Sequence, residues 1–354
     1  MDNERPTPLV EDPETTRRKL ESWLSRQWGQ AVQIPALTIP ESSGMSNVTL
    51  LFDAQWQEGG RTHTEACVGR LQPQVERPAF PSYDLGLQYE VMASIGRHSD
   101  IPVPRLLGLE LDRSLLGVQF YVMKRTPGRI PPDMPPYNMD GWMLRETSEQ
   151  ERAAMWRAAL EVMGKIHLLD YKALGFGHLE KAGTTALQNQ LNYWQDYLVW
   201  ALEGGGHAIC QAALDWLQAR QPAAEPTVLC WGDSRIGNII FRESLDGVAA
   251  VLDWEMAVLG NPVQDLAWFN YMDAIFSEGL GMPRLPGLPS YEDSIDQWQQ
   301  QTGYCARDYD YYLVFAGMRF GLLLSRIMLA TGQTGQVQGN FACQLLQKTL
   351  DRLG

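Results

Sequence analysis

The sequence of 354 residues contains no long apolar run, few cysteines and fewer basic than acidic residues. Because no stretch of about 18 apolar residues occurs, we expect no transmembrane helix and no membrane partner. The segment 1–20 is polar and acidic and lacks the apolar centre of a secretory signal, so we expect a cytoplasmic protein. Lysine and arginine number 29 against 42 acidic residues, a net charge of −13. This balance argues against a nucleic-acid partner, because binding to a polyanion needs a basic face.

The cysteines are five, widely scattered, and include no Cys-x-x-Cys pair. This pattern predicts a reduced protein without a zinc framework, in which each cysteine is a small buried residue. The histidines indicate no metal site either, since His167 ends an apolar helical stripe, as a core histidine does, and the other four show no metal spacing. The cysteines are Cys67, Cys210, Cys230, Cys305 and Cys343.

The first third of the chain is rich in strand patterns. Short apolar runs over 48–52, 66–71 and 117–123 predict strands. Helical spacing of apolar residues predicts one helix that begins at Pro13 and ends at Gly29, and a second over 87–95. This part therefore combines a small sheet with few helices.

A Pro-rich passage separates this part from a longer helical one. Five prolines lie within the segment 127–136, which excludes regular structure there. Beyond it, Ser148-Glu-Gln-Glu151 is a capping box that begins the first of several amphipathic helices. Strands followed by helices indicate an α+β fold. We place its parts at 1–30 (a tail and a helix), 31–125 (the smaller, strand-rich part) and 126–354 (the larger, mostly helical part).

The segment 228–252 interrupts the helical part with short apolar runs and carries most of the chemistry. Asp233, Asn238 and Asp253 each stand at the end of a strand or loop. A hairpin between Asn238 and Asp253 would bring both side chains to the same end of a small sheet. An amide oxygen and a carboxylate suit Mg²⁺, which prefers oxygen ligands and usually shares substrate phosphates. Asp233 would remain to accept a proton, a division of labour that phosphoryl transfer uses.

Three motifs in this region are similar to those of the aminoglycoside phosphotransferase (APH)-type family. They are Gly-Asp-x4-Asn-x2-Phe from Gly232, Val-Leu-Asp-Trp-Glu from Val251, and Leu-Gly-Asn-Pro-x2-Asp-Leu-Ala-Trp from Leu259. The chain resembles more narrowly the branch related to the kinase-like domain of acyl-CoA dehydrogenase fusion proteins, roughly from residue 30 onward. The resemblance implies a protein-kinase-like two-lobe fold, with a small strand-rich N-lobe and a larger, mostly helical C-lobe.

The resemblance also implies residue roles and cofactors. Asp233 matches the catalytic Asp, Asn238 and Asp253 match the ligands of Mg²⁺, and Asp265 matches a structural acidic residue. ATP would be the phosphate donor. Many members of the family have His before Gly-Asp, whereas this chain has Trp231. Since all three chemical groups remain, we interpret Trp231 as a structural variation that braces the loop by packing and through its indole N–H.

A short loop before the first long strand matches the phosphate-covering loop of the family. Taken alone, this segment with one glycine would be an ordinary turn that leads into a strand. The resemblance implies that it binds the nucleotide. The residues concerned are Ser43, Gly44, Ser46 and Asn47.

Four further residues of the N-terminal part match nucleotide-binding positions. Arg70 stands where kinases place a phosphate-pairing Lys, and offers a planar bidentate fork in place of a point charge. Glu90 would be its partner, although without the motifs above a surface salt bridge would be the simpler interpretation. Backbone groups near Lys124 and Arg125 match the inter-lobe hinge that meets adenine.

Together these features predict an ATP- and Mg²⁺-dependent phosphotransferase that acts on a hydroxyl of a small molecule, that is, a small-molecule kinase. Two alternatives stay open: a non-catalytic kinase-like module that binds nucleotide, and a kinase acting on a hydroxyacyl-CoA. A hydrolase with Ser234 as nucleophile is disfavoured, because Gly-x-Ser-x-Gly requires glycine where Ile236 stands. The pattern selects neither the acceptor nor the oligomeric state.

Overall fold

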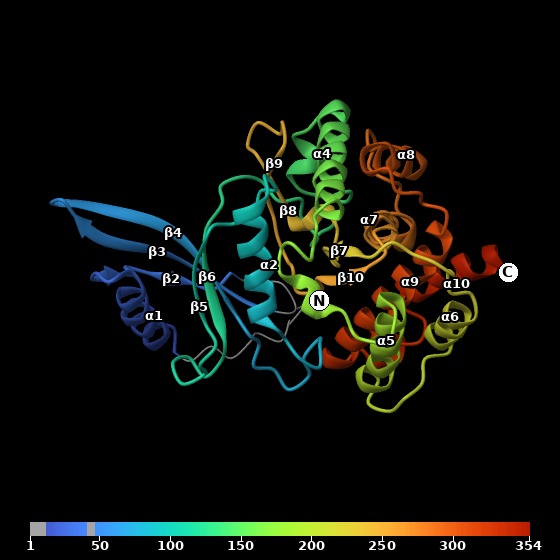
Figure 1. The fold of residues 1–354 in the computed structure, drawn as a ribbon, viewed down its shortest axis with the longest axis horizontal. Coiled ribbons are helices and arrows are strands. Elements are labelled where there is room, and N and C mark those ends of the chain that lie inside the picture. Colours follow the sequence, from blue (N-terminus) through green and yellow to red (C-terminus); the bar gives the residue numbers. More distant parts are fainter. Residues whose placement is uncertain (1–11, 41–46) are drawn as a thin grey trace. The chain divides into compact units, whose positions relative to one another are not determined.

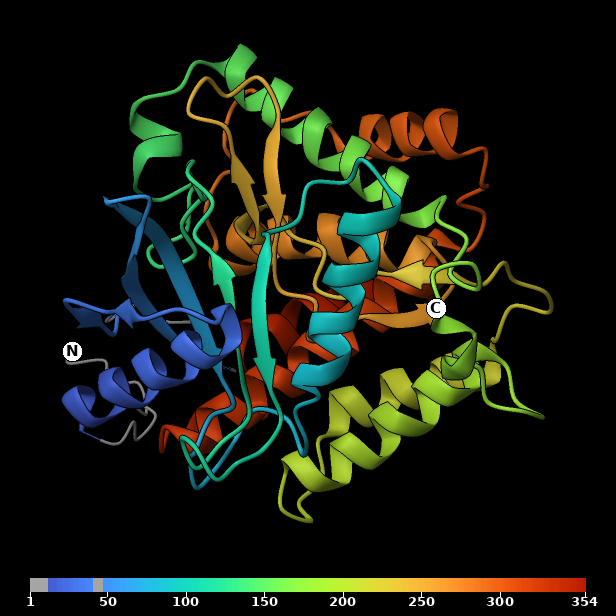
Figure 2. The ribbon, with the colours of Figure 1, turned by 60° about the vertical axis from the view of Figure 1, so that its left-hand side comes forward.

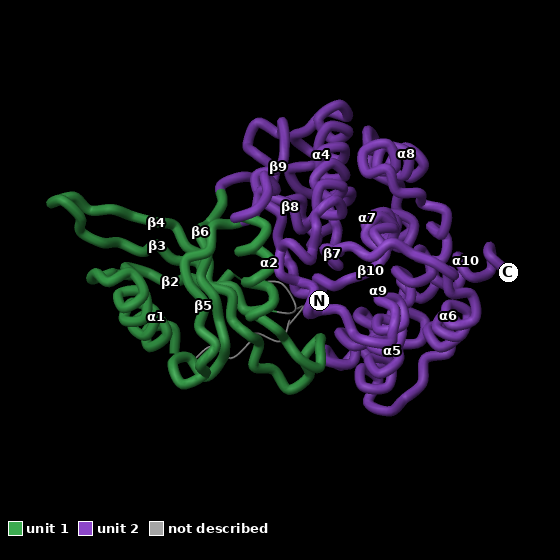
Figure 3. The backbone as a smooth tube through the Cα atoms, in the orientation of Figure 1, with its two compact units in different colours: residues 1–96, 104–126 green, residues 97–103, 127–354 purple. Residues whose placement is uncertain are grey.

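The computed structural model describes residues 12–40 and 47–354 (Figure 1). The chain forms two compact units, coloured separately in Figure 3. Unit 1 comprises Met1–Gly96 and Pro104–Thr126, and unit 2 comprises Arg97–Val103 and Pro127–Gly354. The sequence did not indicate that the segment Arg97–Val103 belongs to unit 2. There its Pro102 carbonyl accepts a hydrogen bond from the Val251 N–H at 2.9 Å.

Unit 1 is built on an antiparallel sheet of six strands. The order is β1-β3-β4-β6-β5, with β2 also paired to β3. The long β3–β4 hairpin turns at Gly59 and Gly60, whose φ angles of 57° and 76° lie in the left-handed region that glycine adopts without strain. The strands are β1 (Val32–Gln33), β2 (Leu37–Thr38), β3 (Val48–Glu58), β4 (Arg61–Leu71), β5 (Leu106–Glu110) and β6 (Phe120–Lys124).

Two helices accompany this sheet: α1 (Pro13–Trp28) and α2 (Leu85–His98). The structure confirms the predicted α1, in which Asp12 caps the first turn and Gly29 ends the helix with φ 65°. Trp23 of α1 is 1% exposed and packs edge-on against Phe120 of β6 at 4.9 Å between ring centroids. The apolar face of α1 and one face of the sheet therefore form the core of unit 1.

Unit 2 consists of helices around two small antiparallel sheets (Figure 2). One sheet pairs β7 with β10 and the other pairs β8 with β9. The predicted Ser148–Glu151 capping box is confirmed at the start of α4. The helices are α3 (Trp142–Arg145), α4 (Glu149–His167), α5 (Ala186–Ala201), α6 (Ala208–Ala219), α7 (Val263–Phe276), α8 (Tyr291–Thr302), α9 (Tyr309–Ala330) and α10 (Phe341–Leu353). The strands are β7 (Val228–Cys230), β8 (Ile239–Phe241), β9 (Val248–Val251) and β10 (Val258–Gly260).

Helix α9 is central to unit 2 and packs against α5, α6, α7 and α10. By length and composition alone it could cross a membrane, with a mean hydropathy of 1.7 over its most apolar window. Two arginines, Arg319 and Arg326, interrupt this apolar run. Because 67% of that window is buried inside the protein, α9 has the character of a core helix.

The α+β class predicted from the sequence is confirmed. Strands dominate unit 1, whereas unit 2 is mostly helical; its strands β7, β8 and β9 fall within the segment 228–252 that interrupts the helical pattern, and β10 follows shortly after it. These two small sheets position the groups described next.

Candidate active site

The pairing of β8 with β9 brings the predicted metal ligands to the same end of one small sheet. Strand β8 begins directly after Asn238, and β9 ends two residues before Asp253. Ile239 pairs with Val251, and the Leu252 N–H donates to the Asn238 carbonyl at 2.9 Å. The predicted hairpin is therefore confirmed, and it places Asn238 and Asp253 at the same end of the β8–β9 sheet.

Asp233 lies in the loop after β7 and accepts hydrogen bonds from three side chains. Its Oδ1 accepts from the Trp268 indole at 2.9 Å. Its Oδ2 accepts from Asn238 Nδ2 at 2.6 Å and from Arg235 Nε at 3.1 Å. The Asp233 side chain stays 13% exposed. A carboxylate has about four lone-pair sites, so three donors fix its orientation and leave room for one further donor.

Arg235 connects Asp233 to the Pro-rich segment. Its guanidinium pairs with the Asp133 carboxylate on one side and with Asp233 on the other. Although burial disfavours the charge, the two carboxylates raise the pKa of Arg235 above its ordinary value. The Pro-rich segment is itself attached to β8, because the backbones of Arg129 and Phe241 exchange two hydrogen bonds of 2.8 and 2.9 Å. No pattern in the sequence predicted this contact of Asp133 with Arg235.

Asp265 holds the backbone of the loop that carries Asp233. It lies in the first turn of α7 and is fully buried. Its carboxylate accepts the backbone N–H of Trp231 at 2.6 Å and of Gly232 at 3.0 Å. Ser234 donates to the Asp265 carbonyl at 2.7 Å. The predicted structural role of Asp265 thus takes a specific form, since this residue holds Trp231, Gly232 and Ser234 of the loop from the first turn of α7.

Asn261, Pro262 and Gln264 have the spacing of a capping box at the start of α7, and only half of such a box is present. The Asn261 side chain accepts the Val263 N–H at 2.9 Å, as an N-cap does. The Gln264 side chain does not complete the box, because neither of its polar atoms has a hydrogen-bond partner among the described residues. The helix start is fixed by Asn261 and Pro262 instead.

His167 supports Asp265 from behind. The two side chains are fully buried, with His167 Nε2 at 3.1 Å from Asp265 Oδ2. The Trp298 indole donates to His167 Nδ1 at 2.9 Å. Because an indole N–H can only donate, Nδ1 is the acceptor and Nε2 carries the proton that bonds to Asp265. The interpretation of His167 as a satisfied core histidine is confirmed.

Gly232 can be no other residue in this geometry. Its φ is 91°, and a Cβ built on it would lie 1.9 Å from the Met256 carbonyl oxygen. Its own carbonyl accepts a hydrogen bond from Arg319 Nη2 at 3.0 Å. The turn before Asp233 is therefore held on its N–H side by Asp265 and on its carbonyl side by Arg319.

Arg319 is a component that sequence reasoning missed. It is 2% exposed, and its guanidinium stacks on the Trp268 ring at 4.5 Å. Burial lowers the pKa of Arg319 to about 10, while Asp265 and Asp233 favour its charge. An arginine within the apolar pattern of 309–330 was the available signal, because a buried charge requires a partner.

The residues Asn238 and Asp253 suit a metal. Both Nδ2 contacts of Asn238 go to Asp233, to its carbonyl at 3.0 Å and to its carboxylate, so the amide oxygen is the atom left for a cation. Asp253 has a φ of 58°, a conformation rare for a non-glycine residue, and such residues cluster at functional sites. An amide oxygen next to a carboxylate is a donor set that fits Mg²⁺.

Trp231 braces the loop in the way predicted for it. Its side chain is fully buried, and its indole donates to the Leu252 carbonyl at 2.8 Å, one residue before Asp253. Trp254 is also buried and lies 6.2 Å from Trp231 between ring centroids. Trp254 is therefore a buried neighbour of Trp231 beneath the loop.

The predicted nucleotide-binding residues of unit 1 are only partly described. Ser43, Gly44 and Ser46 lie outside the described residues, and Asn47 is buried immediately before β3. Arg70 extends from β4 and donates to the Thr49 hydroxyl on β3 at 3.0 Å. Glu90 occupies an exposed position of α2, and its pairing with Arg70 stays a prediction.

The hinge residues use their backbone donors within unit 1. The Lys124 N–H donates to the Arg105 carbonyl and the Arg125 N–H to the Ala66 carbonyl, both at 2.8 Å. The Lys124 ammonium pairs with Glu65 at 2.9 Å. An adenine would therefore meet groups of this segment other than these two N–H donors.

Comparisons with known proteins agree with this geometry. A profile of the phosphotransferase enzyme family (APH) matches residues 77–298. The chain belongs to the APH phosphotransferase family. Its matched region contains Asp233, Asn238, Asp253 and Asp265, so the site described above lies inside the family's own segment.

The curated relatives of this APH chain are longer proteins. It is 27% identical to the probable acyl-CoA dehydrogenase IBR3 of Arabidopsis thaliana over 335 residues, 88% of this chain and 39% of that protein. It is 31% identical to acyl-CoA dehydrogenase family member 11 of Gallus gallus over 229 residues, 64% of this chain and 27% of that protein. The chain thus spans less than half the length of these relatives, and it corresponds to their kinase-like regions.

Solved structures show the same fold. A "putative aminoglycoside phosphotransferase" of Ralstonia eutropha matches with a TM-score of 0.66 at 24% identity, covering 94% of this chain and 98% of that one. A thermostable mutant of aminoglycoside phosphotransferase APH(4)-Ia, in a ternary complex with AMP-PNP and hygromycin B, matches with a TM-score of 0.57 at 19% identity over 94% and 98% of the two chains. The predicted kinase-like fold is confirmed.

We predict that Asp265→Asn destabilises the protein. The amide would present N–H groups where the native carboxylate accepts from Trp231, Gly232 and His167, so at least one buried donor loses its acceptor. The free energy of unfolding should fall by about 2–4 kcal/mol. Urea unfolding followed by tryptophan fluorescence measures this change.

Asp296→Asn, at an exposed position of α8, is the matched control and should stay within about 0.5 kcal/mol of the wild type. Equal stability of the two variants would contradict the role given to Asp265.

Proposed function

We propose that this APH-family chain is an ATP- and Mg²⁺-dependent small-molecule kinase that transfers the γ-phosphate to a hydroxyl group. The observation that carries the proposal is Asp233, a partly exposed carboxylate fixed by three side-chain donors, next to Asn238. Asp253 lies at the same end of the β8–β9 hairpin as Asn238 and supplies a second oxygen ligand. One oriented carboxylate beside two oxygen ligands is the arrangement that phosphoryl transfer needs.

Asp233 would act on the acceptor. Its remaining lone-pair site can accept the hydrogen bond of an incoming hydroxyl, which turns a hydroxyl oxygen toward the phosphate and takes up its proton as the new bond forms. Phosphoryl transfer proceeds through a loose transition state, so orientation of the acceptor is the main contribution that a carboxylate makes. The donors from Trp268, Arg235 and Asn238 keep Asp233 in one orientation.

Asn238 and Asp253 would hold the metal through the amide oxygen and the carboxylate. When bound, Mg²⁺ neutralises charge on the nucleotide phosphates. Because Asn238 also donates to Asp233, it couples the position of the metal ligand to that of the carboxylate. The two functional groups are thus oriented by one shared amide.

The acceptor class follows from the relatives rather than from a pocket. APH(4)-Ia forms ternary complexes with ADP or AMP-PNP and hygromycin B, which supports a hydroxylated small molecule as the acceptor here. The curated relatives are acyl-CoA dehydrogenase family proteins, which supports a hydroxyacyl-CoA as a narrower candidate. A non-catalytic module is the competing proposal, and the presence of Asp233, Asn238 and Asp253 together counts against it.

We predict that Asp233→Asn abolishes transfer but not nucleotide binding. Without a group that accepts the hydroxyl proton, kcat should fall about 10³-fold with any accepted substrate. Mg-ATP should still raise the melting temperature, because the metal ligands are intact. Transfer from radiolabelled ATP to a panel of hydroxylated metabolites, including hydroxyacyl-CoA, gives the first readout, and thermal shift with Mg-ATP gives the second.

The matched control is Asp246→Asn, an exposed carboxylate in the turn of the β8–β9 hairpin. It should leave both readouts unchanged. Turnover that survives in Asp233→Asn would refute the assignment of the catalytic residue. Failure of the wild type to respond to Mg-ATP would contradict both the kinase and the nucleotide-binding module and favour a degenerate fold.

We also predict that Trp268→Phe lowers kcat while leaving the KM for ATP unchanged. The phenyl ring keeps the apolar contact with Arg319 but removes the indole donor to Asp233 Oδ1. Loss of one hydrogen bond to a charged group should cost about tenfold in kcat. Trp216→Phe is the matched control, because the Trp216 indole N–H has no hydrogen-bond partner among the described residues. Equal kinetics for the two variants would show that Trp268 does not orient Asp233.

A further inference from the structure

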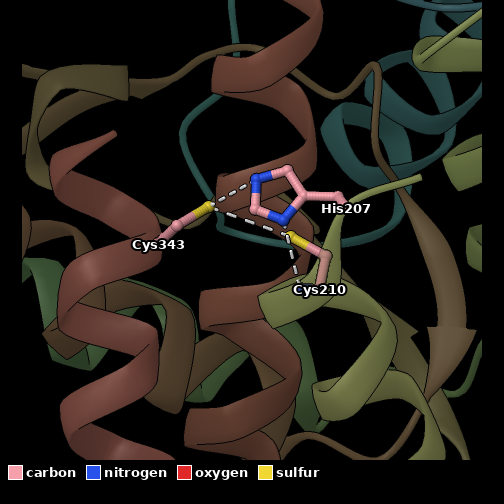
Figure 4. A group of neighbouring side chains, drawn as sticks. All are labelled: His207, Cys210 and Cys343. Carbon is pink, nitrogen blue, oxygen red and sulfur yellow. Dashed lines mark hydrogen bonds between the residues drawn. The ribbon is translucent and has the colours of Figure 1, made fainter. Parts of the chain in front are cut away.

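A second group of reactive side chains lies in unit 2, outside the catalytic loop (Figure 4). His207, Cys210 and Cys343 are buried, and their ligand atoms lie within 4.8 Å of one another. The two sulfur atoms are 3.9 Å apart, and Cys343 Sγ is 3.4 Å from His207 Nε2. The cysteines are 133 positions apart in the chain, so the sequence gave no indication of this pair.

Each cysteine occupies the third position of a helix. Cys210 follows the cap residue His207 of α6, and Cys343 follows the cap residue Asn340 of α10. The first turns of two helices of 12 and 13 residues therefore meet at the sulfur pair. The N-terminus of a helix stabilises a negative charge, and a thiolate in that position forms more readily than in water.

The imidazole of His207 has a defined tautomer. Its Nδ1 accepts from the Cys210 N–H at 3.4 Å, so the neutral ring carries its proton on Nε2. This N–H faces Cys343 Sγ and the Val337 carbonyl, which is 3.1 Å away. A hydrogen bond from Cys210 lowers the pKa of the Cys343 thiol, with a further contribution from His207, whereas the pKa of Cys210 is raised. The donors that face Cys343 therefore favour it as the thiolate of the pair, with Cys210 as the thiol.

Helix α9 leaves space for both sulfurs at Gly321. A Cβ at this position would lie 2.9 Å from Cys343 Sγ and 3.4 Å from Cys210 Sγ. Any larger residue would push the sulfurs away from the helix. The glycine therefore allows two thiols to remain in van der Waals contact in a closely packed interior.

The same geometry disfavours a metal ion. A structural zinc site has four protein ligands and a catalytic one has three with an open position, whereas this group offers three ligands that are all buried. Binding through His207 Nε2 would also move the ring proton to Nδ1, which already faces the Cys210 N–H donor. The Nδ1–H of His207 and the backbone N–H of Cys210 would then face each other with no acceptor between them.

We propose that Cys210 and Cys343 are an oxidation site that forms a reversible disulfide between α6 and α10, with peroxide as the oxidant. The Cys343 thiolate attacks one peroxide oxygen, so that an S–O bond forms, the O–O bond breaks and hydroxide leaves. This hydroxide takes up the proton that Cys343 released on ionisation and becomes water. The Cys210 sulfur then attacks the resulting sulfenic acid, an S–S bond forms, and the released hydroxide takes the Cys210 proton and leaves as water. Two thiols lose two electrons in total and peroxide becomes two molecules of water.

Access to the pair is through the segment between α9 and α10. Val337, whose carbonyl binds His207, is buried, but its neighbours Gln336 and Gln338 are exposed. Gly335 and Gly339 on either side meet nothing within 4 Å at their Cβ positions. This segment is attached to the start of α6 by Val337 and by Gln338, whose side chain donates to the Gly206 carbonyl at 2.6 Å. Local opening of these contacts would admit a molecule as small as peroxide.

The test uses the full-length wild-type protein. It is incubated with hydrogen peroxide over a time course, alkylated, digested without reduction and mapped by mass spectrometry. We expect one disulfide peptide that joins Cys210 to Cys343, a loss of two hydrogens from the intact mass, and full reversal by dithiothreitol. Cys67 and Cys230, which are buried elsewhere, should remain thiols. Cys305, which is exposed, serves as the internal control for unassisted oxidation.

Two variants test whether His207 speeds disulfide formation or whether the closeness of the two sulfurs is sufficient. His207→Asn keeps a good helix cap but removes the Nε2–H, so disulfide formation should slow about tenfold if the thiolate fraction falls accordingly. Cys210→Ala should stop Cys343 at the sulfenic or sulfinic acid. A disulfide that forms at the same rate in His207→Asn would contradict the thiolate mechanism.

Two further outcomes would overturn the proposal. One is peroxide-treated wild type in which Cys210 and Cys343 both stay alkylatable after Cys305 has reacted completely. The other is a metal: elemental analysis that finds one zinc per chain, lost in both Cys210→Ala and Cys343→Ala, would make the group a metal site instead.

Discussion

The loop after β7, which carries Asp233, depends on one buried carboxylate, that of Asp265. The loop after β7 presents two backbone N–H groups to the interior, and buried donors require acceptors. Asp265 supplies both from the first turn of α7, and His167 orients it from α4. The tight turn at Gly232 follows from this contact, and the direction of Asp233 follows from the turn. The orientation of Asp233, the proposed catalytic residue, is thus fixed by contacts of the loop backbone one and two residues before it.

Charge balance around Asp265 shows how an acidic protein stabilises carboxylates in its interior. The chain carries a net charge of −13, but Arg235 and Arg319 concentrate positive charge beside Asp233 and Asp265. Arg319 is buried and Arg235 is partly buried, so solvent screens their interactions with carboxylates less than it does on the surface. These interactions offset the negative charge of Asp233 and Asp265.

Much of this arrangement was readable from the sequence, because motif residues follow strand ends at short spacing. The α+β class, the hairpin that joins Asn238 to Asp253 and the bracing role of Trp231 needed only local patterns. Asp133, Arg319 and the Cys210–Cys343 contact did not appear, since each depends on residues about 80 to 130 positions apart. The missing half of the α7 capping box shows the same limit, because the buried Gln264 side chain makes no hydrogen bond to the start of the helix.

The central claim is that the Asp233 loop and the β8–β9 hairpin end form one magnesium–nucleotide site. A crystal structure of the protein with Mg²⁺ and AMP-PNP tests it most directly. The account predicts a metal about 2.1 Å from the Asn238 amide oxygen and from the Asp253 carboxylate, bridged to the phosphates, with Asp233 facing the terminal phosphate. A metal coordinated by other residues, or a nucleotide whose phosphates do not reach this hairpin end, would contradict it.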